Sequence, residues 1–169
     1  MTWRIETDRL LLRPLVPGDL DGFLPVVNDP MSMRFYPKPF DREMARVWIE
    51  RVGERYERDG YGLLAVVERE TGEMVGVCGV VHVDGTGPDV ELVYEFQRSA
   101  WGQGYATEAA RACLAAALGP LGLKRVVALA YPENAQSIRI MQKLGMRDTG
   151  MIDAYGHQLV CYEALAGDE

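Results

Sequence analysis

The sequence predicts an α/β fold of the α+β mixed-sheet kind, formed by a single domain over residues 1–169. Short runs rich in β-branched residues alternate with longer stretches whose apolar residues recur at helical spacing. No linker, repeat or low-complexity segment divides the chain, and its length is ordinary for one domain. The predicted order of elements is β-α-α-β-β-β-α-β-α-β-β.

The first third of the chain is predicted to hold one strand and two helices. Residues 9–13 read as a short strand, and residues 19–27 as a short helix broken by Asn-Asp-Pro at 28–30. Asp41 is a good N-cap for the second helix, whose apolar residues recur at i+4 spacing until the chain reaches Gly60.

Three strands and a long helix are predicted next. Residues 63–67 and 74–81 form two strands joined by a Glu-Thr-Gly-Glu turn, and residues 90–96 form a third. Apolar residues then follow helix spacing over residues 106–118, and Gly119 with the proline after it ends that helix.

The remaining chain is predicted to close the sheet. Residues 125–130 form an apolar strand, and residues 135–144 form a helix that ends at a glycine. Residues 146–152 and 158–164 form a final strand pair around a turn at 155–156.

Composition excludes several classes of function. The net charge of −7 argues against general nucleic-acid binding. It would attract a cationic partner such as an amine, with plain solubility as the alternative explanation. No apolar stretch is long enough to cross a membrane, so we expect a cytoplasmic protein. Cys78, Cys113 and Cys161 lack metal-ligand spacing, and His82 and His157 stand alone, so no metal site is expected.

The most informative stretch is Trp-Gly-Gln-Gly-Tyr-Ala-Thr-Glu at residues 101–108, between a strand and a helix. Two glycines in such a turn let backbone N–H groups face a ligand, and the first turn of the helix attracts an anion. The third glycine and the later acid of a dinucleotide fingerprint are missing, and no P-loop string exists. The stretch therefore predicts a phosphorylated cofactor, with a ligand-free tight connection as the alternative.

A second group of polar residues follows the strand at residues 125–130. Asn134 can cap the next helix, and Ser137 lies about one turn further on, so both project from its N-terminal end. An amide and a hydroxyl at that place could line a tunnel between two strands. An N-cap with a surface serine is the alternative.

Together with two further strings, these motifs resemble the GNAT superfamily of acetyltransferases over nearly the whole chain. The resemblance is greatest to the branch that acetylates the N-termini of ribosomal proteins (the RimJ/RimL type). The matching strings are Thr-Asp-Arg-Leu-Leu-Leu-Arg at 7–13, Glu-Leu-Val-Tyr at 91–94, the glycine turn, and Asn-x-x-Ser at 134–137 with Lys-Leu-Gly-Met at 143–146.

The resemblance implies that acetyl-CoA is bound and that its acetyl group passes to an amine, without a metal. It implies that strand-end backbone pairs with the pantetheine arm, that turn amides hold the pyrophosphate, and that Ser137 protonates the leaving thiolate. The implied cofactor-binding residues are Phe96, Gln97, Arg98, Gly102, Gln103, Gly104, Tyr105, Ala106, Thr107, Asn134 and Ser137.

The chain departs from the family pattern at two positions. Trp101 stands where many relatives carry Arg or Gln, so anion binding would depend on backbone donors. Met141 stands where many relatives carry a tyrosine that protonates the thiolate, which is why Ser137 is expected to act instead. Arg139 is a candidate for the nucleotide phosphate, with a solvated surface arginine as the alternative.

The acceptor must be a neutral amine, and we expect Glu91 to take up its proton, directly or through water, with Glu95 as second candidate. An exposed strand acid or a structural hydrogen bond is the alternative. A peptide α-amine is neutral far more often at pH 7 than a lysine, which favours a protein or peptide N-terminus. Residues 31–40 are expected to form the acceptor wall. Three alternatives stay open. The acceptor could be a small amine such as an aminoglycoside or polyamine, the protein could be a CoA-binding module without turnover, and it could form a homodimer through the last strands.

Overall fold

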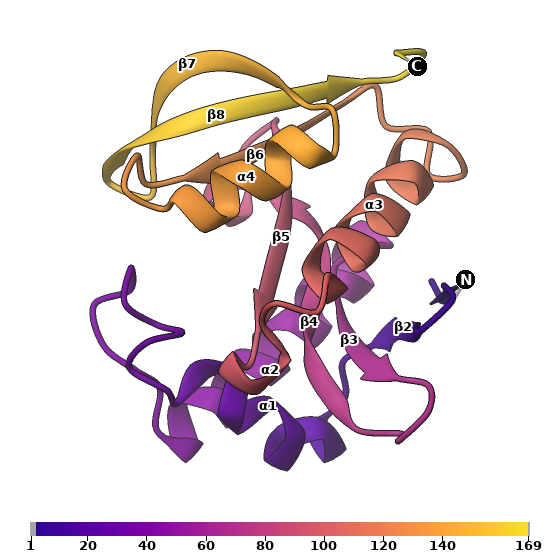
Figure 1. The fold of residues 1–169 in the computed structure, drawn as a ribbon, viewed down its shortest axis with the longest axis vertical. Coiled ribbons are helices and arrows are strands. Elements are labelled where there is room, and N and C mark those ends of the chain that lie inside the picture. Colours follow the sequence, from indigo (N-terminus) through magenta and orange to yellow (C-terminus); the bar gives the residue numbers. More distant parts are fainter. Residues whose placement is uncertain (1–2, 169) are drawn as a thin grey trace.

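The computed structural model describes residues 3–168, which form one eight-stranded sheet with helices on both faces (Figure 1). The strand order across the sheet is β1-β2-β3-β4-β5-β6-β8-β7. The elements are β1 (Ile5–Glu6), β2 (Leu10–Pro14), α1 (Leu20–Val27), α2 (Arg42–Asp59), β3 (Leu63–Glu68), β4 (Met74–His82), β5 (Val90–Phe96), α3 (Tyr105–Leu118), β6 (Arg125–Ala130), α4 (Ala135–Lys143), β7 (Arg147–Ala154) and β8 (His157–Leu165).

This architecture confirms the predicted mixed sheet and the predicted order of helices and strands from β2 onward. Strand β1 was not predicted, because two residues are too few to show a period; the strand exists only by pairing with β2. Helix α3 begins at Tyr105, one residue before the predicted start, and β7 begins at Arg147, one residue after it.

The sheet is split between its two halves. All neighbouring strands pair antiparallel except β5 and β6, which run parallel and meet at one register, Glu91 with Val127. Parallel strands that separate after one pairing leave a wedge between their carboxyl ends. From Leu92 onward, β5 therefore has no partner strand on its β6 side.

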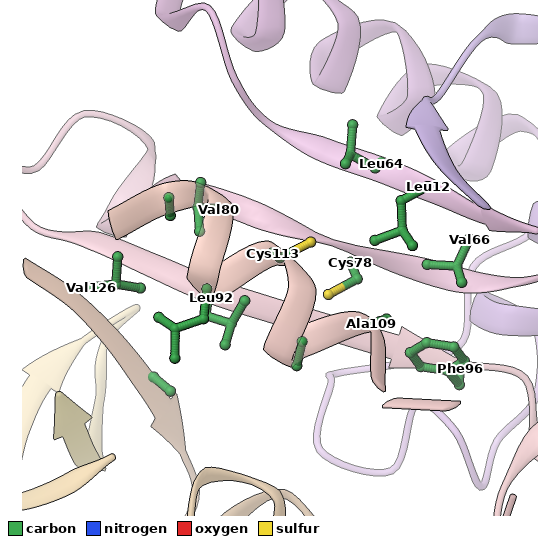
Figure 2. Packing of buried hydrophobic residues seen from close by; sticks show 14 of the residues in the cluster. Leu12, Leu64, Val66, Cys78, Val80, Leu92, Phe96, Ala109, Cys113 and Val126 are labelled. Atoms are coloured by element: carbon green, nitrogen blue, oxygen red, sulfur yellow. The ribbon is translucent and has the colours of Figure 1, made fainter. Parts of the chain in front are cut away.

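Each face of β5 contacts a different layer of helices, because side chains alternate along a strand. Leu92 and Phe96 belong to the core beneath α3, and Figure 2 shows them beside Ala109 and Cys113 of that helix. Val93 packs on the opposite face, in the cluster that α1 and α2 cover. Groups on the two faces of β5 can thus meet only through the wedge.

Local signals explain the helix that covers the second face. Asp41 accepts a hydrogen bond from the backbone N–H of Met44, which caps α2 as predicted. Gly60 ends α2 with φ of 78°, a conformation that glycine adopts without strain. The buried face of α2 then packs Ala45, Ile49 and Val52 into the second cluster.

Candidate active site

A cavity of about 530 Å³ occupies the wedge between β5 and β6. Its walls come from both faces of the sheet: the start of α4, the odd and even positions of β5, the loop between α1 and α2, and the turn between β7 and β8. The cavity therefore connects the two faces at the point where the strands separate. Two reactants that approach from opposite sides could meet there.

On the α4 side of the cavity, Asn134, Ser137 and Tyr94 are joined by hydrogen bonds. The Asn134 Oδ1 atom accepts from the backbone N–H of Ser137 at 3.2 Å, so Asn134 caps α4 as expected. The Ser137 Oγ atom lies 2.9 Å from the Tyr94 hydroxyl, and that hydroxyl also lies 3.0 Å from the Ser137 carbonyl oxygen. Burial raises the pKa of Tyr94 well above its usual value, so Tyr94 stays protonated at neutral pH. All three residues line the cavity.

The glycine turn presents a row of free amides. Gly102 and Gly104 have φ of 78° and 80°, the left-handed conformation that favours glycine. Within residues 3–168, no acceptor contacts the backbone N–H groups from Gly102 to Thr107. The first amides of α3 therefore point outward uncapped, as an anion site requires.

A network from the start of β2 fixes this turn. Glu108, in the first turn of α3, accepts from the Thr7 hydroxyl at 2.7 Å and from the Arg9 backbone N–H at 2.9 Å. Arg9 pairs with Glu108 through its guanidinium and donates to the Gln103 carbonyl at 2.8 Å. The Tyr105 ring lies under the same guanidinium, 4.5 Å away. Two distant motifs of the sequence thus hold one loop.

The end of β5 is already partly paired within the protein. The Trp101 indole N–H donates to the Phe96 carbonyl at 2.9 Å, and the Gln97 N–H donates to the Val75 carbonyl at 3.0 Å. Arg98 forms an ion pair with Asp29 of the loop after α1, at 2.9 Å. Trp101, the first departure from the family pattern, therefore braces the turn against the strand.

The opposite side of the cavity holds two carboxyl groups, one from Glu91 and one from Glu95. Glu91 is 6% exposed and accepts a hydrogen bond from the Tyr155 hydroxyl; Glu95 accepts one from the Tyr36 hydroxyl. Burial raises the pKa of Glu91 to about 7, although its bond from Tyr155 acts to lower it. Burial also raises the pKa of Glu95 to about 7, against the lowering effects of Tyr36 and Arg34.

Part of the predicted acceptor wall lines this side. Phe35, Tyr36 and Pro37 contribute to the cavity, as does Arg34, whose guanidinium lies 4.7 Å from the centre of the Phe35 ring. The Phe35 ring in turn stacks on Tyr131 at 5.6 Å.

A second, more open cavity of about 640 Å³ lies against α3. It begins at Gly104 and Thr107, on the free amides, and reaches Arg111 and Lys143. The Ala106 side chain faces the first cavity instead. Arg139 is exposed and contributes to neither of these two cavities.

The structure also shows what the sequence analysis missed. Met141, the second departure, is fully buried in the core and does not line the cavity, whereas Tyr94 does. Tyr36, Tyr94 and Tyr155 all hydrogen-bond to candidate residues across at least 43 positions of sequence. Tyr94 lies in the matching string at 91–94 and Tyr36 in the expected acceptor wall, but neither string indicated these hydrogen bonds. Tyr155 stands before glycine in a predicted two-residue turn, which is an unusual place for a tyrosine.

In the described part of the chain, no group of three or more His, Cys, Asp or Glu side chains could hold a metal ion. No helix among residues 3–168 is both long and apolar enough to cross a membrane.

Comparisons with known proteins agree with this geometry. The chain is 36% identical over 166 residues to the uncharacterized protein YkkB of Bacillus subtilis, covering 95% of this chain and 94% of the relative. It is 28% identical to the uncharacterized N-acetyltransferase p20 of Bacillus licheniformis, over 89% of this chain and 86% of the relative.

The fold is shared with solved structures. A GNAT-family acetyltransferase from Bacillus anthracis superimposes with a TM-score of 0.83 at 24% identity, over 98% of this chain and 100% of that one. RimL, a ribosomal L7/L12 α-N-protein acetyltransferase solved with coenzyme A, has a TM-score of 0.77 at 15% identity, over 96% and 98% of the two chains. The family described as an acetyltransferase (GNAT) domain matches residues 9–147. The chain is therefore a member of the GNAT acetyltransferase family, an acyltransferase that uses acetyl-CoA.

Proposed function

We propose that this protein acetylates the α-amine of a protein or peptide N-terminus, as the RimJ/RimL branch does, by direct transfer from acetyl-CoA with both reactants bound. The observation that carries the proposal is the two-sided cavity. It has hydroxyl and amide groups on the α4 side and a buried carboxyl group on the α2 side. Proximity in such a site supplies much of the rate.

The fit to acetyl-CoA rests on groups without partners. The free amides from Gly102 to Thr107 would hold the pyrophosphate, and the second cavity beside them would take the nucleotide. Asn134 keeps its side-chain N–H₂ donors, since among the described residues only its oxygen is engaged. When bound, the cofactor supplies an activated acetyl group as a thioester.

Proton movements are assigned to the protein's own residues. Glu91 takes the proton of the acceptor amine, directly or through water. On the other face, the Ser137 hydroxyl donates a hydrogen bond toward the leaving sulfur, and the Tyr94 hydroxyl, 2.9 Å from the Ser137 Oγ atom, can replace the proton that Ser137 gives up. Tyr94, which burial keeps protonated, therefore supports the role that Met141 cannot fill.

The basicity of the acceptor favours an α-amine over a lysine, whichever group takes up the proton. Proton transfer from an α-ammonium, with pKa near 8, to a carboxylate with pKa about 7 costs about 1.4 kcal/mol. From a lysine, with pKa near 10.4, the same transfer costs about 4.6 kcal/mol. The difference of about 3.2 kcal/mol, a factor of about 200, comes from the amines themselves, and it favours a weakly basic acceptor.

The test is an acceptor panel read by thiol release and by mass spectrometry. Each peptide contains one lysine and is tested in two forms, one with a free N-terminus and one with a blocked N-terminus. We expect acetylation of the free N-termini only. Exclusive lysine acetylation would contradict the proposed acceptor, and no thiol release with any amine would leave a CoA-binding module without turnover.

A small amine of low basicity, such as an aminosugar, is the second candidate. It is favoured by the size of the cavity and by its aromatic walls, where Phe35 stacks on Tyr131. The same panel distinguishes it, because an aminosugar would then give a far higher kcat/KM than any peptide.

Cofactor binding is tested separately. Gly104→Ala places a side chain on a left-handed residue, 3.4 Å from the Arg9 guanidinium. We expect this variant to bind CoA more weakly than the wild type when the affinity is measured by calorimetry. Gly72→Ala is the matched control, because Gly72 is also left-handed, with φ of 75°, and its side chain would meet nothing within 4 Å. Equal affinities of the two variants would contradict the pyrophosphate site.

A further inference from the structure

Two non-glycine residues of the described chain have a left-handed backbone, and they contact each other. Asp84 has φ of 55° and Tyr155 has φ of 53°. The Asp84 carboxylate accepts from the Tyr155 backbone N–H at 2.9 Å, across 71 positions of sequence. Strained backbone that persists in a folded protein needs a compensating role, and such residues gather at functional sites.

The turn itself gives no reason for a tyrosine. Tyr155 and Gly156 form the two-residue connection between β7 and β8, because Ala154 pairs with His157. Gly156 also has positive φ, at 74°. A hairpin turn with two positive φ angles favours Asn or Gly at its first position, not an aromatic residue. The Tyr155 side chain also stays 47% exposed, so burial does not explain it.

The reason lies at the other end of the side chain. The Tyr155 hydroxyl donates to Glu91, across the mouth of the cavity that both residues line. Glu91 forms no ion pair within the described chain, so the tyrosine hydroxyl is the group that holds its carboxylate. Asp84, the Tyr155 turn and Glu91 form one continuous chain of contacts.

We propose that Tyr155 is a positioning residue: the turn strained against Asp84 holds the tyrosine hydroxyl on Glu91, and so keeps that carboxylate ionised and aimed at the acceptor amine. The inference rests on the proposed function, because it assigns a role to the same site.

The electrostatics support this arrangement. A hydrogen bond to the charged form favours that form, so the Tyr155 hydroxyl acts to lower the pKa of Glu91, while burial and the Asp84 charge act to raise it. Tyr155 contacts Glu91 through its hydroxyl, and the Asp84 charge acts on Glu91 from the turn after β4. The other titratable or charged residues that line the cavity are Tyr36, Glu95, Arg34, Arg55, Tyr94, Tyr131 and His157.

The test is Tyr155→Phe, with Tyr36→Phe as the matched control on the other carboxyl group. The Glu91 carboxyl is titrated by carbon NMR in the free protein, and the acidic limb of kcat/KM is measured with the best acceptor. We expect Tyr155→Phe to raise both midpoints by about one unit, which lowers kcat/KM at pH 7 about five-fold. Tyr36→Phe should leave the Glu91 midpoint where it is.

A second variant separates positioning from stability. Tyr155→Asn creates the Asn-Gly pair that this turn type favours, so its Tm should equal or exceed that of the wild type, with the same shift of the acidic limb. Unmoved midpoints in Tyr155→Phe, or a lower Tm with an unmoved limb in Tyr155→Asn, would overturn the inference. If the wild type transfers no acetyl group, the proposed function fails, and the NMR titration still decides the role of Tyr155.

Discussion

Replacing Glu91 by Gln should make the protein more stable and less active at once. The carboxyl group is 6% exposed, and burial raises its pKa from 4.5 to about 7. A raised pKa means that the folded state holds the proton more tightly than the unfolded state. The contribution to stability is therefore complete below pH 4.5 and is lost as the pH rises through 7.

The magnitude follows from the distance between the two pKa values. A rise from 4.5 to about 7, at about 1.4 kcal/mol per pH unit, gives a cost of about 3 kcal/mol for ionised Glu91 at pH 8. The amide introduced by Glu91→Gln would not titrate and would still accept the Tyr155 hydrogen bond. The variant should therefore gain up to about 3 kcal/mol over the wild type at pH 8, or roughly 6–12 °C in Tm, and nothing at pH 4.

The assay is thermal unfolding of both proteins from pH 4 to pH 8, with kcat/KM measured at pH 8. Loss of the general base should lower kcat/KM at least about ten-fold. Glu43→Gln is the control, since Glu43 is an exposed acid on α2 whose pKa is lowered by Arg46, and its replacement should give no gain. A stability difference that does not change with pH, or full activity of Glu91→Gln, would refute the reasoning.

Two further variants test the network around the cofactor side. Glu108→Ala removes the acceptor that holds the Arg9 backbone and the Thr7 hydroxyl. We expect the free energy of unfolding, measured by calorimetry, to fall by about 2 kcal/mol, and CoA binding to weaken. The control variant, Glu43→Ala, should match the wild type in both. Tyr94→Phe removes both hydrogen bonds between Tyr94 and Ser137. We expect kcat to fall while KM for the acceptor stays unchanged. An acetyl thioester whose thiol is more acidic should restore the rate, since its leaving thiolate needs less protonation. Rates that stay low with that thioester would indicate displaced helix α4 instead.

The sequence predicted the parts of this protein that depend on local pattern. The periods of apolar residues indicated the helices and strands, Asp41 and Asn134 marked two helix starts, and the spacing of Gly102 and Gly104 indicated the turn with free amides. These features need only neighbours along the chain. The polar pair of Asn134 and Ser137 suggested a tunnel between two strands, but strand separation has no period, so its place in the sheet could not be read from the sequence.

The rest depended on contacts between distant segments. Tyr94 touches Ser137 across 43 positions and Tyr155 touches Glu91 across 64, and neither pair leaves a spacing that can be read. Met141 was expected to mark a lost general acid, but its side chain is fully buried and serves to pack the core. Whether Glu91 or Glu95 serves as the base stays a prediction.

The single rung between β5 and β6 has a mechanical consequence. The larger part of the sheet, from β1 to β5, and the smaller part, from β6 to β8, pair at one register only, so we expect the seam between them to open more readily than either part. A molecule that enters the seam touches both parts. Filling it should therefore make the two parts exchange their amide hydrogens as one unit, and substrate occupancy itself should decide how rigid this enzyme is.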